Sequence, residues 1–192
     1  VVGRVTLALP EVLDSGDILV LGSARLGEAS APDRSIGQRQ IDLGETGTYS
    51  QTLQDGNLAL ALTRGTSDYL INGSLKPITA ADALDALKLS VGLASSKGSS
   101  WKELIAADFN HDGRVTAADA LEILKVSVGI NTIQPSWVFV PSSPAFNPGL
   151  AAMNRNAVVY KDELNLGSVL GEVSASFTGI LVGDVNIAHH EI

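Results

Sequence analysis

The sequence has 192 residues, of which 45% are hydrophobic, and it carries a formal net charge of −8 and no cysteine. This length and apolar content suit one folded domain or two to three small modules and exclude long disorder. The lack of cysteine excludes disulfides, thiolate metal sites and cysteine nucleophiles. The acidic charge repels phosphate backbones and attracts hard cations, so nucleic acid is a poor partner. No apolar run approaches the ~20 residues that span a bilayer.

Residues 1–74 predict a small β-sandwich, because short apolar runs alternate with glycine-containing turns. The polar segment 23–40 predicts a long loop. Two further runs, 49–53 and 58–62, flank an Asp-Gly pair. Asp-Gly between apolar runs favours a tight turn, so these runs are predicted to pair as a hairpin.

The opening apolar run, residues 1–9, starts at the first residue of the sequence. A strand at a terminus can add to a sheet edge in a neighbouring copy, and such a head-to-tail contact builds filaments. The alternative is that the run pairs within its own sandwich. Strand addition would make the chain a subunit that assembles with copies of itself.

Residues 75–131 contain an internal duplication, in which residues 78–93 recur 37 positions later as residues 115–130. A repeat of this kind is stronger evidence about the fold than any single motif. Each copy predicts a short helix that begins after a threonine N-cap and ends before a glycine at C′. The caps are Thr79 and Gly92 in the first copy and Thr116 and Gly129 in the second.

Each predicted helix carries an apolar stripe at helical spacing. The stripe residues are Leu84, Leu87 and Val91 in the first copy and Leu121, Leu124 and Val128 in the second. Because the two stripes are nearly identical, we expect the helices to pack against each other about a pseudo-twofold axis.

The second helix is preceded by the pattern of a calcium-binding loop, residues 108–119. Oxygen-bearing residues stand at loop positions 1, 3, 5, 9 and 12, and Gly113 stands at position 6, where the chain must turn around the ion. The predicted ligands are Asp108, Asn110, Asp112, Arg114 through its backbone carbonyl, Thr116 and Asp119. The alternative is a polar turn that only caps a helix.

The first copy has lost the start of this loop, where Ile71, Gly73 and Leu75 replace the first three ligands and only Thr79 and Asp82 remain. Near the C-terminus, Asp184-Val185-Asn186 has the D-x-N spacing of positions 1 and 3. If that segment folds back beside the first helix, Asp82, Asp184 and Asn186 can share a second Ca²⁺. The alternative is a simple turn at Asp184 and a helix-capping Asp82.

Residues 132–192 return to a β pattern and are predicted to form an extension that packs on the other two parts. We expect strands at Trp137–Val140, Ala157–Tyr160 and Ser176–Val182. The prolines between residues 135 and 148 keep the intervening chain extended or turned. The fold class expected is therefore mixed α+β, with parts at 1–74, 75–131 and 132–192.

At residues 78–93 and 108–130 the chain resembles type I dockerins, which are paired loop-helix repeats of the form D-x-N-x-D-G…D-x-x-x-L-K. The resemblance implies two half EF-hands, bound Ca²⁺, an extracellular setting and docking of a helix face onto a cohesin domain. Two pairs of positions that often carry hydroxyls for cohesin contact are here Ala80-Ala81 and Ala117-Ala118.

The sequence is similar, more specifically, to a dockerin-like module of large secreted bacterial surface proteins. In that module a W-x-F-V segment and a terminal G-x-x-x-G-D-V-N follow the repeat, as do Trp137–Val140 and Gly179–Asn186 here. Residues 44–65 also look like the strand pair of a carboxypeptidase-regulatory or collagen-adhesin B-type sandwich.

No catalytic motif of a serine hydrolase, zinc protease or P-loop enzyme is present. The three histidines are His111, inside the calcium loop, and the terminal pair His189 and His190. The terminal pair can bind a transition metal but is interpreted as a solvated tail. We therefore predict that the chain is not an enzyme.

Three functions remain open. The first is a non-catalytic, calcium-stabilised extracellular structural subunit that self-associates into a filament or matrix. The second is a dockerin that anchors to a cohesin domain of a scaffold, and the third is a carbohydrate-binding module that stacks sugars on Trp101 and Trp137. The sequence begins at Val1, which fits either a chain cut at a domain edge or a secreted product whose signal peptide has been removed.

Overall fold

The computed structural model describes residues 78–130, 135–168 and 172–186, together with the backbone of six strands between residues 3 and 63. Side chains are described for residues 78–130, 135–164 and 177–186.

The chain divides into two compact units. The first comprises Val1–Gly65, Phe139–Asn147 and Lys161–Gly179, and the second comprises Thr66–Val138, Pro148–Tyr160 and Ile180–Ile192. The predicted division at 1–74, 75–131 and 132–192 stays a prediction. The C-terminal third contributes residues to both units.

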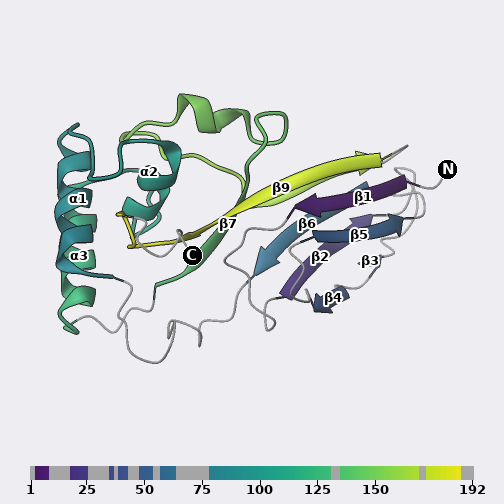
Figure 1. The fold of residues 1–192 in the computed structure, drawn as a ribbon, viewed down its shortest axis with the longest axis horizontal. Helices are drawn as coiled ribbons and strands as arrows, with labels where there is room; N and C mark the ends of the chain where they lie inside the picture. Colours follow the sequence, from purple (N-terminus) through teal and green to yellow (C-terminus); the bar gives the residue numbers. More distant parts are fainter. Residues whose placement is uncertain are drawn as a thin grey trace. The chain divides into compact units, whose positions relative to one another are not determined.

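The first unit contains two sheets (Figure 1). One has the strand order β5-β1-β9-β7, and the other has the order β3-β2-β6-β8 with β4 also paired to β2. The strands are β1 (Gly3–Ala8), β2 (Ile18–Arg25), β3 (Ser35–Ile36), β4 (Arg39–Asp42), β5 (Thr48–Leu53), β6 (Asn57–Thr63), β7 (Trp137–Pro141), β8 (Glu163–Ser168) and β9 (Glu172–Leu181). Helices and sheets together confirm the mixed α+β class. The packing of a β-sandwich by residues 1–74 depends on side chains outside the described residues and stays a prediction.

The predicted hairpin of β5 and β6 is wrong. The two strands lie in different sheets, where β5 pairs antiparallel with β1 and β6 pairs antiparallel with β2 and β8. An Asp-Gly pair favours a reversal of the chain, but it does not decide which strands the two flanking runs bond to.

The predicted loop 23–40 is also shorter than expected, because β2 extends to Arg25 and the short strands β3 and β4 pair with β2. These two strands have two and four residues with one isoleucine each, so they are too short to show the apolar alternation that identifies a strand in sequence.

Strand β1 is paired on both sides within its own sheet. It runs antiparallel to β5 and parallel to β9, with Val5 opposite Gln51 on one side and Val173 on the other. Of the two fates considered for residues 1–9, pairing within the chain is therefore the one observed. Both edges of β1 are already paired, so β1 cannot add to a sheet in a neighbouring copy without losing one of these partners.

The C-terminal strands are confirmed in part. Strands β7 and β9 lie where residues 137–140 and 176–182 predict them, although β9 begins four residues earlier. Residues 157–160 are not a strand: they hold only an isolated bridge between Asn154 and Ala157, after the 3-10 helix η2 (Pro148–Ala152). The next strand is β8 instead.

The second unit contains the duplicated helices, α1 (Ala80–Ser90) and α3 (Ala117–Ser127), with the short helix α2 (Trp101–Ala107) between them in the chain. Thr79 and Thr116 are the N-cap residues, as predicted. Gly92 and Gly129 follow the helices with φ of +84° and +75°, the left-handed conformation that glycine adopts at C′. None of the helices in the described part has the length and apolar character needed to cross a membrane.

Helix α2 was not predicted, although a signal for it exists. Its N-cap Ser100 accepts a hydrogen bond from Lys102 N at 3.3 Å and donates one to Glu103, three residues on. Ser-x-x-Glu before an apolar run is the sequence signature of a capping box. The apolar residues of α2, Leu104, Ile105, Ala106 and Ala107, are all buried in this unit.

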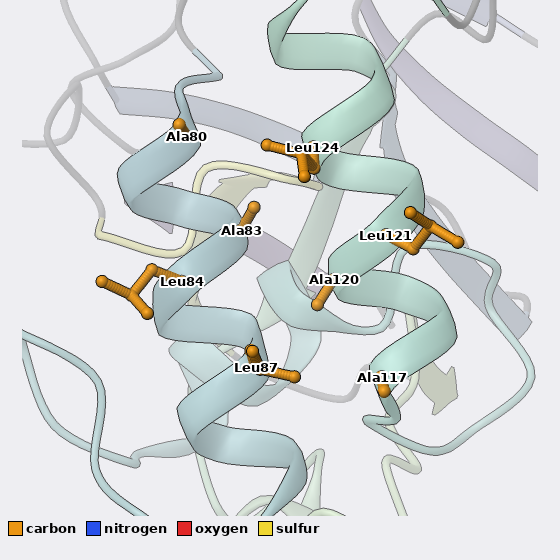
Figure 2. Close-up of a pocket in the computed structure, with 8 residues that line it drawn as sticks. All are labelled: Ala80, Ala83, Leu84, Leu87, Ala117, Ala120, Leu121 and Leu124. Atoms are coloured by element: carbon orange, nitrogen blue, oxygen red, sulfur yellow. The ribbon is translucent and has the colours of Figure 1, made fainter.

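The predicted helix pairing is right, but the predicted contact face is wrong. Helices α1 and α3 run antiparallel side by side, and Ala83 and Ala120 point into the space between them (Figure 2). The two helices bury other residues, such as Ala86 on α1 and Ile123 on α3, both of which are 0% exposed. The six stripe residues Leu84, Leu87, Val91, Leu121, Leu124 and Val128 are exposed. Helical periodicity shows which residues share a face, but not what covers that face.

Candidate calcium site and helix face

The loop 108–119 starts where α2 ends, with Asp108 as the C-cap residue. Asp108 is buried, with 3% of its surface exposed. Its two carboxylate oxygens accept hydrogen bonds from Asp112 N at 3.1 Å and Gly113 N at 3.0 Å. His111 and Gly113 have φ of +57° and +84°, and these two left-handed residues close the loop around that carboxylate.

Asp119 closes the loop from the other end. It lies at N3 of α3 and is completely buried. Its Oδ2 accepts hydrogen bonds from Thr116 N at 2.9 Å and Thr116 Oγ1 at 2.8 Å, while its Oδ1 accepts one from Asn110 N at 3.2 Å. One carboxylate thus joins the start of the loop to the start of the helix.

The remaining predicted ligands lie on the exposed side of the loop. Asn110 Oδ1 accepts a hydrogen bond from Asp112 N at 2.9 Å, and Asp112 Oδ1 accepts one from Arg114 N at 2.9 Å. The structure therefore brings all six predicted residues into one 12-residue turn.

The negative charges of the aspartates in this loop repel one another. Burial raises the pKa of Asp108, and the nearby negative charges of Asp119 and Asp112 raise it further, against the hydrogen bond from Gly113 and the charge of His111. In the described part, no three acidic, histidine or cysteine side chains are already gathered as a metal cluster. A divalent cation would draw the three carboxylates together and offset their repulsion, and the all-oxygen donor set fits Ca²⁺.

The first repeat has the same carboxylate at its helix start. Asp82 is completely buried. Its Oδ2 accepts hydrogen bonds from Thr79 N at 2.8 Å and Thr79 Oγ1 at 2.7 Å. Its Oδ1 accepts one from Asn186 N at 2.9 Å, across 104 residues of chain. The structure therefore places the Asp184-Val185-Asn186 segment beside α1.

Comparison with known families identifies this part of the chain. Residues 79–126 match the family model of the dockerin type I domain. The match covers α1, α2, the loop 108–119 and all of α3 except its last residue. Type I dockerin domains bind Ca²⁺ in EF-hand-like loops, act as non-catalytic protein-interaction modules and occur in secreted or cell-surface proteins. Searches of curated proteins and of solved structures each gave no significant match.

A segment outside the matched residues pairs with the loop of the dockerin module. Val115 N donates to Arg155 O at 2.8 Å, and Val158 N donates to Gly113 O at 2.8 Å. The Arg155 guanidinium also donates to Ser90 O at the end of α1. The segment 153–158 therefore holds the loop 108–119 and the end of the first helix in one arrangement, which no local pattern in the sequence indicated.

The two helices of the dockerin module form a shallow apolar groove of about 350 Å³ (Figure 2). Its lining consists of four pairs of identical residues 37 positions apart: Ala80 and Ala117, Ala83 and Ala120, Leu84 and Leu121, and Leu87 and Leu124. Because the helices are antiparallel, each pair is related by the pseudo-twofold axis between them. Each repeat therefore contributes the same four residues to the groove.

Proposed function

We propose that this chain is a non-catalytic, calcium-stabilised assembly subunit of extracellular protein complexes. Its dockerin module docks through the exposed face of α1 and α3 onto a cohesin-type domain of another protein. The family match to residues 79–126 supports a protein partner of this kind.

The observation that carries this proposal is the distribution of exposed apolar side chains. Nine large hydrophobic residues of the described part are exposed, and eight of them form four pairs related by the repeat. The pairs are Leu84 with Leu121, Leu87 with Leu124, Val91 with Val128, and Leu93 with Ile130. The exposed fractions are similar within a pair, for example 54% and 51% for the first. Apolar patches of this kind mark sites where a partner removes water from the surface.

The chemistry of the groove defines the partner surface. Ala80 and Ala117 stand where a hydroxyl often contacts a cohesin, and both line the groove. Without those hydroxyls, the interface core depends on burial of leucine, so the partner must present an apolar surface of matching shape. Calcium would contribute to docking indirectly, because it would bind Asp119, and Asp119 fixes the start of α3.

A second candidate is self-association through the same face. The pseudo-twofold arrangement of the groove favours it, because a twofold dimer uses a self-complementary patch. This route replaces strand addition through residues 1–9, which the pairing of β1 disfavours.

The test uses Leu84→Glu combined with Leu121→Glu, and Val159→Glu as the control. Val159 is the ninth exposed hydrophobic residue, 67% exposed, and lies outside the groove. Binding to a panel of purified cohesin domains is measured by calorimetry with and without chelator, and the molar mass by light scattering. We expect calcium-dependent binding that the double variant weakens at least about thirtyfold, since loss of an interface hot spot costs about 2 kcal/mol.

The outcomes separate the two candidates. A dimer that the double variant dissociates, with no cohesin bound, supports self-association. A monomer that binds no cohesin domain in the presence of Ca²⁺ contradicts both candidates. Equal binding by the double variant and the Val159→Glu control excludes the groove as the interface.

A further inference from the structure

We propose that the described structure holds a second calcium site, formed by Asp82 at the start of α1 and by Asp184 and Asn186 of the C-terminal segment. This site joins two parts of the chain that lie 104 residues apart. The inference concerns the metal and does not depend on the identity of the docking partner.

The first step is a comparison of the two helix starts within the chain. In the loop 108–119, Asp119 Oδ2 accepts from the backbone N and the hydroxyl of Thr116, at 2.9 and 2.8 Å. In the first repeat, Asp82 Oδ2 accepts from the same two atoms of Thr79, at 2.8 and 2.7 Å. The last ligand position of a calcium loop is therefore present at both helices in the same arrangement.

The second step concerns the other oxygen of each carboxylate. Asp119 Oδ1 accepts from Asn110 N at 3.2 Å, and Asp82 Oδ1 accepts from Asn186 N at 2.9 Å. Asn186 thus makes at Asp82 the contact that Asn110, at loop position 3, makes at Asp119.

The third step extends this correspondence to loop position 1. Asp184 precedes Asn186 by two residues, as Asp108 precedes Asn110. The residue between them is apolar and buried in both segments, Val185 at 0% and Phe109 at 6% exposure. A fragment with the spacing and anchoring of a calcium loop therefore stands where the first repeat has lost its own.

Close packing fixes the position of this fragment. Gly183 N donates to Ala106 O at 2.7 Å at the end of α2. Gly183 has φ of +100°, and a Cβ there would lie 2.5 Å from Ile78 Cδ1 and 3.2 Å from Phe109 Cε2. Only glycine allows the segment to approach this closely.

Electrostatics supply the reason for a cation. Asp82 and Asp184 are both completely buried in this unit. Burying a carboxylate is costly unless hydrogen bonds or an opposite charge compensate. The family that residues 79–126 match binds Ca²⁺ in its EF-hand-like loops. Two carboxylates and one amide oxygen are hard ligands, and water would complete the six to eight oxygens that Ca²⁺ requires. With fewer protein ligands, the site binds more weakly than loop 108–119.

The experiment counts bound calcium on the full chain by equilibrium dialysis against Ca²⁺ alone. Four proteins are compared: wild type, Asp108→Asn, Asp184→Asn and the double variant. We expect two, one, one and no bound ions per chain. Asp162→Asn is the matched control, because it removes an exposed carboxylate from the C-terminal part and should leave two ions bound.

Asparagine keeps the size and one acceptor oxygen of Asp184 and removes its charge, and circular dichroism verifies that each variant folds. A second variant, Asn186→Ala, retains both buried carboxylates and should lower only the weaker affinity, with loop 108–119 still binding its ion. One bound ion in the wild type, unchanged by Asp184→Asn, would overturn the proposal. So would the absence of bound Ca²⁺ in folded Asp108→Asn at millimolar calcium. Neither result concerns cohesin binding, so this proposal and the proposed function fail separately.

Discussion

At the scale of single residues, the two repeats use equivalent positions differently. Asp85 on α1 and Glu122 on α3 are related by the duplication, and each pairs with a lysine three residues later at 2.7 Å. The Asp85 side chain is 4% exposed, whereas that of Glu122 is 30% exposed. Asp85 also accepts a hydrogen bond from Ser96 N at 3.0 Å, so it fixes the chain that leaves α1.

This difference predicts a pH-dependent contribution of Asp85 to stability. Burial raises the pKa of Asp85, but the hydrogen bonds from Lys88 and Ser96 and the charge of Lys88 outweigh burial and hold the pKa below its usual value. A carboxyl with a lower pKa in the folded state stabilises the fold above its unfolded pKa, and this stabilisation is lost as the pH falls through the folded pKa. Asp85→Asn should therefore cost about 1–3 kcal/mol at pH 7, as expected for a buried charged hydrogen bond.

The measurement is chemical denaturation of wild type and variant between pH 7 and pH 2.5. The difference between them should shrink toward the acid end. Glu122→Gln is the control and should change stability by only about 0–1 kcal/mol, because its ion pair is partly exposed. A difference for Asp85→Asn that stays constant with pH contradicts the assigned role of its charge.

At the scale of elements, the helices depend on segments far from them in sequence. The loop of α3 pairs with residues 153–158, and the start of α1 is bonded to residue 186. The second unit is therefore a dockerin-type helix pair completed by the C-terminal part of the chain.

Gly183 tests this dependence. Gly183→Ala forces a side chain into Ile78 and a non-glycine residue into φ of +100°, so we expect a destabilisation of about 1–3 kcal/mol from overpacking and backbone strain together. Gly98→Ala is the matched control: Gly98 has φ of +129°, but a Cβ at this position would meet no atom within 4 Å. Thermal denaturation should show a smaller loss for Gly98→Ala than for Gly183→Ala. Equal losses would mean that the close approach at Gly183 does not contribute.

At the scale of the whole molecule, bound calcium should act on global stability. Binding to the folded state alone stabilises it by mass action. The carboxylates of Asp108 and Asp119 lie buried near each other in the folded loop, and they separate when the chain unfolds.

We therefore expect Ca²⁺ at a hundredfold excess over Kd to add about 2.7 kcal/mol to the free energy of unfolding, which chelator removes. Asp108→Ala should abolish most of this response, whereas Asp162→Ala should retain it. Calorimetric melting of the three proteins with and without chelator measures the effect. An identical wild-type melt in both conditions would show that calcium is not part of the fold.

Several features of this protein follow from local sequence alone. The threonine caps, the glycines at C′ and the loop 108–119 all depend on contacts within about a dozen residues, and such contacts survive whatever the rest of the chain does. The duplication also allowed the second helix to be interpreted from the first. These local rules led to the predicted calcium ligands and to the two main helices.

Other features were decided only by the tertiary structure. Periodicity grouped Leu84 with Leu87 and Leu121 with Leu124 but did not show that this face is exposed, because exposure depends on whether another element packs against that face. Strand partners were similarly undetermined, since β5 and β6 are neighbours in sequence but bond to different sheets. The contact between Asp82 and Asn186 joins residues that lie 104 positions apart in sequence. The D-x-N spacing of residues 184–186 can suggest such a contact, but only the packing of the whole unit forms it.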